Sequence, residues 1–129
     1  MFAAIADPVA RANWGTPSDT AVVIFDEADF RDSGQDRFRC GSKENPNIHG
    51  VTGYLEITPH RRVVSSETVT VDGKRLCVSL STLELTPQGR NTALKHTTQL
   101  ASFIGQDMVD GHTTGTNASL DNLVRHFSK

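Results

Sequence analysis

The chain has 129 residues, a hydrophobic content of 36% and a formal net charge of −2. This length predicts one domain covering residues 1–129, which buries roughly two thirds of the surface of the unfolded chain. Lysines and arginines form no cluster that could neutralise a run of phosphates, and no apolar run approaches the roughly 20 residues of a membrane span. We therefore expect neither a nucleic acid nor a membrane as a partner.

The N-terminus and the two cysteines favour a cytoplasmic protein. Asp7 and Pro8 interrupt the apolar start too early for a secretory signal. Cys40 and Cys77 lie far apart and form no CxxC pattern, which argues against a disulfide framework or a zinc site. We therefore expect two reduced thiols, no metal and no cofactor, in the cytoplasm.

Two short helices are predicted at the N-terminus. Phe2, Ile5 and Ala6 have the spacing of a buried helical face. Asp7 followed by Pro8 is typical of an N-cap and the first position of a second helix, because proline fixes a helical φ and needs no hydrogen-bond acceptor there.

Six stretches with the features of β-strands follow. They cover residues 19–30, 35–41, 51–59, 61–71, 75–86 and 92–103. In the third stretch, Val51, Leu55 and Ile57 fall on one predicted face and Tyr54 falls on the other. The order of elements predicts an α+β protein with an antiparallel sheet of about six strands.

Turn residues join the last three strands. Asp72-Gly73 favours a two-residue hairpin, because both residues tolerate the positive φ that its turn requires, and Pro87-Gln88-Gly89 predicts the next turn. The apolar phase changes between Leu80 and Leu83, which predicts a β-bulge near Ser81-Thr82. The final element is a helix with an apolar stripe of Leu120, Leu123, Val124 and Phe127.

Four stretches resemble the SRPBCC superfamily, which has the START or Bet v 1-like helix-grip fold. The similar branch is that of bacterial proteins grouped with the activator of Hsp90 ATPase (AHSA1-like). The stretches are FAAIADPVARANWG, EADFRDSGQDRFRCGS, GYLEITPHRRVVSSE and STLELTPQGRNTALKHT. The resemblance implies a curved antiparallel sheet wrapped around a long C-terminal helix, with two short N-terminal helices and a ligand cavity between sheet and helix.

One departure from that family concerns its first strand. Family members usually open with a β-strand that pairs with the last strand, whereas this chain opens in the first helix. Either the start was assigned too late or the domain lacks that strand. The last strand, about Thr92 to Phe103, then becomes an exposed edge. We expect a second copy of the chain, in a homodimer, or rearranged N-terminal residues to cover it.

The resemblance, combined with strand alternation, predicts which residues line the cavity. These ligand-binding candidates are Trp14, Phe38, Cys40, Leu55, Glu67, Leu80, Leu94, His96, Thr98 and His112. Glu67 and His96 lie on strands that flank one central strand, about 10 Å apart, so they could contact one ligand from two sides or perform acid–base chemistry. The alternative is that the register differs, or that Ser65, Thr98 or water satisfies both groups.

Three functions remain open at this point. The first is binding of a small apolar or amphipathic molecule between sheet and helix. The second is an enzyme of the polyketide cyclase or dehydratase kind, with Glu67 or His96 as the acid–base group. The third is a protein-interaction role like that of the Hsp90 activators. The residues do not decide whether the protein is an enzyme.

Overall fold

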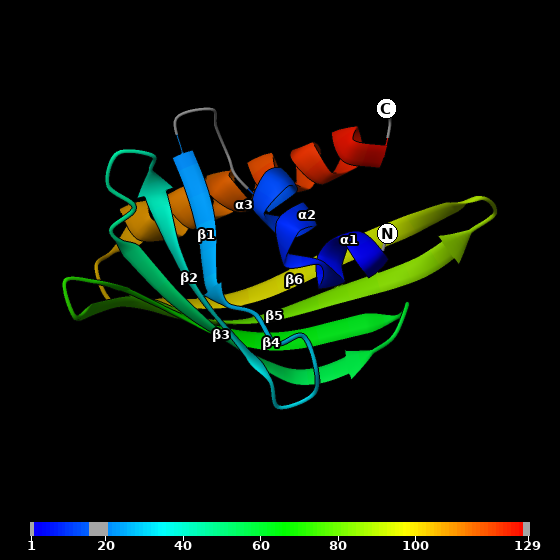
Figure 1. Ribbon diagram of the computed structural model, residues 1–129, viewed down its shortest axis with the longest axis horizontal. Helices are drawn as coiled ribbons and strands as arrows, with labels where there is room; N and C mark the ends of the chain where they lie inside the picture. Colours follow the sequence, from blue (N-terminus) through cyan, green and yellow to red (C-terminus); the bar gives the residue numbers. More distant parts are fainter. Residues whose placement is uncertain (1, 16–20, 128–129) are drawn as a thin grey trace.

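The computed structural model describes residues 2–15 and 21–127, without the side chain of His126. The elements are α1 (Phe2–Ala6), α2 (Pro8–Gly15), β1 (Ala21–Glu27), β2 (Gln35–Ser42), β3 (Ile48–Thr58), β4 (Arg62–Val71), β5 (Lys74–Gln88), β6 (Asn91–Ser102) and α3 (Gln106–Phe127). Figure 1 shows a curved sheet with the three helices on one side of it. The predicted α+β helix-grip arrangement is confirmed, although residues 19 and 20 of the first predicted strand lie outside the described residues.

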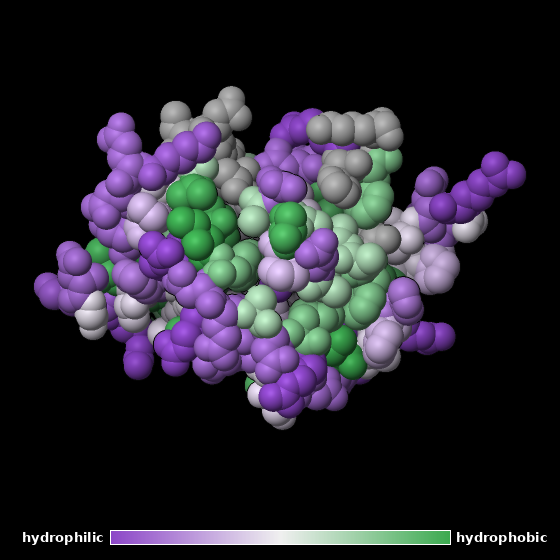
Figure 2. Space-filling view, viewed as in Figure 1, coloured by the Kyte–Doolittle hydropathy of each residue, from purple (hydrophilic) through white to green (hydrophobic). Residues whose placement is uncertain are grey.

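The sheet is a meander in which each strand pairs with the next one in the chain. All five pairings are antiparallel, and the order is β1-β2-β3-β4-β5-β6. Within the described residues, β1 and β6 are therefore the two edges of the sheet. Hydrophobic atoms reach the surface over β1 and around the N-terminal helices (Figure 2). Only β6 has the length to present a long open edge, with 12 residues against seven in β1.

The strand register decides which side chains face the helices. Tyr54, Ser65, Ser81 and Thr98 lie opposite one another across β3, β4, β5 and β6. The buried Tyr54 marks their shared face as the concave one, because side chains on paired residues point to the same side of a sheet. Alternate residues from this row lie on the same concave face wherever the register is continuous.

The main core lies between α1 and the centre of the sheet. It consists of Ile5, Tyr54, Val63 and Leu85, with Phe2, Trp14, Phe30, Ile57, Leu83 and Leu94 packed around it. Burial of each large apolar side chain contributes roughly 1.5–3 kcal/mol to folding. From α3, Leu123 is buried to 1% exposure. This core holds the N-terminal helices against the sheet.

Two local sequence signals are confirmed. Asp72 and Gly73 have φ angles of 50° and 78°, so the hairpin between β4 and β5 uses the left-handed conformation that its turn requires. The side chain of Asp7 accepts a hydrogen bond from the backbone N–H of Val9 at 3.0 Å, which caps the first turn of α2.

The bulge predicted near Ser81-Thr82 is wrong. The β5–β6 register is continuous from Cys77 to Gln88, and the β4–β5 register shifts between Val69 and Thr70, where Leu76 is the extra residue. The concave face of β5 carries an unbroken alternation of Cys77, Ser79, Ser81, Leu83 and Leu85. Ser79 and Ser81 occupy part of this inner face. The apolar residues alone therefore gave the false impression that the inward-facing positions change phase along β5.

The apolar stripe predicted for the last helix holds only in part. Leu123 is buried, whereas Val124 is 62% exposed and Phe127 is 49% exposed. Val124 follows Leu123 by about 100° around the helix and so leaves the packed face. The packed stripe of α3 instead continues toward the N-terminus through Leu120, Thr116 and His112, which are all partly buried.

Candidate functional site

A groove of about 170 Å³ lies between β6 and α3. It is lined by His96, Thr98, His112, Thr113, Thr116, Asn117 and Leu120. The five helical residues recur at the spacing of adjacent turns and so form one stripe of α3. His96 and Thr98 form the opposite wall, because both lie on the concave face of β6. Three of the ten predicted ligand-binding residues therefore lie together here.

Hydrogen bonds hold the β6 wall of the groove. The Nε2 atom of His96 lies 2.9 Å from the Oγ1 atom of Thr98, and that oxygen lies 3.4 Å from the Oγ atom of Ser81 on β5.

Burial lowers the pKa of His96, and the nearby His112 lowers it further because two imidazolium ions would repel each other. Burial likewise lowers the pKa of His112. Both imidazoles are therefore predominantly neutral at pH 7.

Glu67 also faces the concave side but lies outside the groove. It pairs with Ser79, which pairs with Leu100, four residues from His96 along β6. Two strand spacings and four residues of strand correspond to a separation of roughly 16 Å between Glu67 and His96. The predicted separation of about 10 Å is therefore wrong, because it ignored the stagger along the strands. At this separation the two side chains cannot exchange a proton directly.

Glu67 is a desolvated carboxyl group. It is partly buried, and desolvation raises its pKa to about 7. Desolvation, with the charge of Glu67 as a smaller cause, raises the pKa of the Cys40 thiol to about 11. Cys40 is therefore a thiol rather than a reactive thiolate at neutral pH.

Within the described residues, no group of three or more His, Cys, Asp or Glu is arranged to hold a metal ion.

The remaining predicted residues are scattered over the fold. Phe38 on β2 packs against Phe25, with 5.9 Å between ring centroids. Leu94 packs on the core, and Trp14 links the helices by donating a hydrogen bond from Nε1 to the carbonyl of Ala4 at 2.9 Å. The structure does not bring these three residues to the groove.

Two predicted cavity residues point away from the helices. Leu55 is 59% exposed, because the β3–β4 register shifts between Tyr54 and Glu56 and makes Leu55 the extra residue of a bulge. This bulge places Tyr54 and Ile57 on the buried face, against the predicted alternation. Leu80 is 39% exposed and lies on the convex face of β5, since its neighbour Ser79 faces inward.

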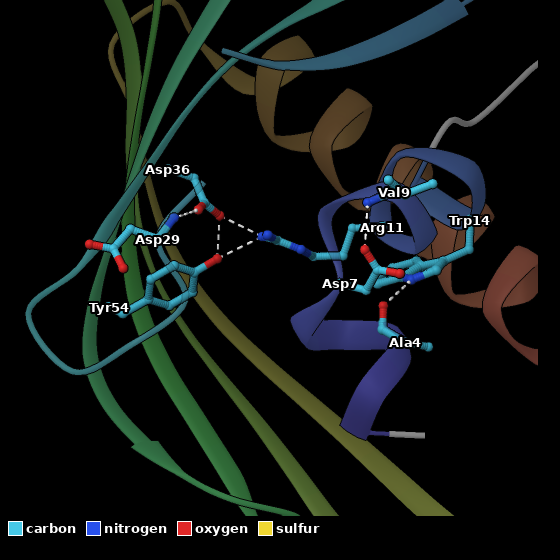
Figure 3. Close-up of polar contacts among 8 residues, drawn as sticks. All are labelled: Ala4, Asp7, Val9, Arg11, Trp14, Asp29, Asp36 and Tyr54. Carbon is cyan, nitrogen blue, oxygen red and sulfur yellow. Dashed lines mark hydrogen bonds and ion pairs between the residues drawn. The ribbon is translucent and has the colours of Figure 1, made fainter. Parts of the chain in front are cut away.

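The structure contains a buried ionic cluster that the sequence analysis did not predict. The Nη1 atom of Arg11 on α2 lies 2.5 Å from Oδ2 of Asp36 and donates to the Tyr54 hydroxyl at 2.6 Å, and that hydroxyl donates to Asp36 (Figure 3). Asp36 also accepts the backbone N–H of Asp29 at 3.1 Å. The Arg11 guanidinium stacks 4.6 Å from the centroid of the Phe25 ring. The available signal was strand alternation, because Asp36 lies two residues from Phe38 on β2 and so shares its face.

This cluster fastens α2 to β2 and β3. Asp36 is fully buried, so its charge is compensated by the guanidinium and by two hydrogen-bond donors rather than by water. Desolvation, with the hydrogen bond to Asp36 as a further cause, raises the pKa of the Tyr54 hydroxyl well above its usual range. The Nε and Nη2 atoms of Arg11 are buried without a hydrogen-bond partner among the described residues, and only Nη1 contacts Asp36 and Tyr54. The cluster therefore has a structural role in holding α2 on the sheet.

The fold and the sequence together identify the family. The model of the family described as "Activator of Hsp90 ATPase homolog 1-like protein" matches residues 1–128. The chain therefore belongs to this AHSA1-like family, within the helix-grip or SRPBCC class of folds. A search of curated proteins found no match.

Solved structures of bacterial proteins have the same fold. The Mll3558 protein of Rhizobium loti is 33% identical, with a TM-score of 0.81 over 95% of this chain and 83% of its own. The CV1439 protein of Chromobacterium violaceum is 22% identical, with a TM-score of 0.79 over 95% of this chain and 83% of its own. A protein of Rhizobium leguminosarum is 22% identical, with a TM-score of 0.80 over 95% of this chain and 80% of its own.

Length and hydropathy of the helices bear on the expected absence of a membrane partner. Over residues 2–15 and 21–127, none of the helices combines the length and apolar character that crossing a membrane requires.

Proposed function

We propose that this protein binds a small amphipathic molecule between its sheet and α3. The observation that carries the proposal is the groove in which His96 and Thr98 of β6 face His112 of α3. The groove is concave and its polar groups converge, which are two features of small-molecule sites, while its lining is more polar than that of most such sites. Membership of the AHSA1-like family is compatible with this function.

The test is thermal stabilisation by amphipathic compounds, combined with native mass spectrometry of freshly purified protein. A ligand that binds only the folded state stabilises it by about 2.7 kcal/mol at a concentration 100 times its Kd. Thr116→Phe fills the groove and is expected to abolish this stabilisation, whereas Thr114→Phe, at an exposed position outside the groove, keeps it. Equal stabilisation of both variants would refute the location.

Glu67 supports a second candidate function, acid–base catalysis of the cyclase or dehydratase kind. A carboxyl group with a pKa of about 7 exchanges protons readily at neutral pH, which suits a general acid or base. Its roughly 16 Å separation from His96 means that Glu67 would act without the imidazole. A turnover assay with Glu67→Gln tests this candidate, and activity retained in that variant would exclude Glu67 as the catalytic group.

A second copy of the chain is the proposed cover for the open edge of β6. Unpaired backbone groups of an edge strand favour addition of another strand. Antiparallel self-pairing about Thr97 would place Leu94 opposite Leu100 and Ala93 opposite Ala101, with no like charges opposed. Light scattering across a concentration series should show a dimer, and a species that remains monomeric into the millimolar range would refute this assembly.

A further inference from the structure

The groove between β6 and α3 is lined without any acid or strong base. Its polar side chains are three threonines, one asparagine and two histidines, and Leu120 is its one apolar residue. Two charged neighbours along the chain are directed elsewhere. Lys95 is exposed and lies on the convex face of β6, opposite Glu84, and Asp110 accepts a hydrogen bond from Gln106 at 3.1 Å.

The two histidines add no charge at neutral pH. Burial lowers the pKa of both, and the proximity of His96 and His112 disfavours a second proton. A carboxylate, phosphate or ammonium group that entered this groove would lose part of its water without meeting an opposite charge among the lining residues. Burial of an unpaired charge is far more costly than burial of a neutral polar group that finds hydrogen-bond partners.

A threonine hydroxyl, an asparagine amide and a neutral imidazole each have a donor and an acceptor. Two of the hydroxyls are already engaged, because Thr113 donates to the carbonyl of Val109 at 3.0 Å and Thr98 lies 2.9 Å from Nε2 of His96.

The side chains of Thr116, Asn117 and His112 keep both a donor and an acceptor for a ligand. The complementary groups on a ligand are therefore hydroxyls, which also donate and accept. The groove volume of about 170 Å³ is below the roughly 300–1,000 Å³ of sites that hold a whole drug-sized ligand, so the groove suits a single ring-sized group.

We propose that the groove takes an uncharged, hydroxyl-bearing headgroup, of the class of a sugar ring or a polyol, attached to an apolar chain. Thr116, Asn117 and His112 bind the hydroxyls, and Leu120 contacts the start of the apolar chain. This assignment rests on the proposed function, because it names the chemical class of the ligand for the same site.

The experiment compares three probes that share an eight-carbon chain. Octyl β-glucoside, octanoate and octylammonium are titrated below their micellar concentrations at neutral pH, with calorimetry as the readout. The glucoside is expected to bind at least about tenfold more tightly than either ion, because only its headgroup can be satisfied without an opposite charge. Equal or tighter binding of an ion overturns the ligand class alone, and absence of binding by all three overturns the proposed function as well.

Three variants locate the headgroup. Thr116→Val removes a hydroxyl at nearly constant shape and is expected to weaken glucoside binding about fivefold, the equivalent of one hydrogen bond. Thr114→Val, outside the groove, is the matched control and should leave the affinity unchanged. Asn117→Lys introduces a cation and should shift the preference toward octanoate by about tenfold or more. Unchanged glucoside binding and unchanged preference in folded variants would overturn the assignment.

Discussion

Glu67→Gln is the substitution that most directly tests the electrostatics of the concave face. Glu67 lies on β4 between paired residues Thr52 and Ser79, and no hydrogen bond or ion pair to its carboxylate is observed among the described residues. Desolvation is the cause of its raised pKa. Glutamine has nearly the same shape as the protonated acid, so the substitution removes the ionisation with little change in packing.

The expected magnitude follows from proton linkage. The carboxyl has a pKa of 4.5 when unperturbed and about 7 in the folded protein, so the folded state holds a proton that the unfolded chain has released. Folding stability is therefore full below pH 4.5, falls between pH 4.5 and 7 and stays low above pH 7. The total loss is about 3 kcal/mol, as an upper estimate, from about 1.4 kcal/mol per pH unit.

Urea unfolding at pH 5 and at pH 8 measures this loss. Relative to the natural protein, Glu67→Gln should gain less than about 1 kcal/mol at pH 5 and about 3 kcal/mol at pH 8. Glu44→Gln, at an exposed loop position, is the control and should change stability little at either pH. An equal gain for Glu67→Gln at both pH values, or a loss at pH 8, would show that the carboxylate is paired and that the reasoning is wrong.

Two further predictions concern packing. Asp36→Asn leaves the guanidinium of Arg11 buried beside a neutral group and should lower the free energy of unfolding in urea by about 3 kcal/mol. The control Asp26→Asn removes an exposed ion pair and should lower it by less than about 1 kcal/mol. Similar losses for the two variants would contradict a buried role for Asp36. Gly50→Ala would place a Cβ atom 2.0 Å from the Phe38 ring, so it should destabilise the protein by about 1–3 kcal/mol. Adding Phe38→Leu to this variant should recover part of the loss. An unchanged unfolding midpoint for Gly50→Ala would refute this contact.

The fold was largely predictable because its signals are local. The Asp72-Gly73 turn, the Asp7 cap and the strand alternation each depend on a few neighbouring residues, whose conformational preferences operate before any tertiary contact forms. The four stretches that resemble the family placed these elements in the correct order, and the match over residues 1–128 confirms the family.

The candidate site was predictable only in part. Alternation along β6 correctly placed His96 and Thr98 on the inner face, and the fold placed His112 near them. Leu55 was misplaced because a bulge inserts one residue and reverses the alternation after it. Nothing in the local sequence around Tyr54 marks that bulge, since the register of β3 depends on its pairing with β4.

The sequence by itself determined the elements, their order and the helix-grip family, because turns, caps and periodicity act over short separations along the chain. The tertiary structure alone decided which residues meet. Arg11 finds Asp36 across 25 positions of sequence, and the stagger between β4 and β6 separates Glu67 from His96. These outcomes depend on strand register and on how α2 and α3 pack on the sheet, which are properties of the whole fold rather than of any local segment.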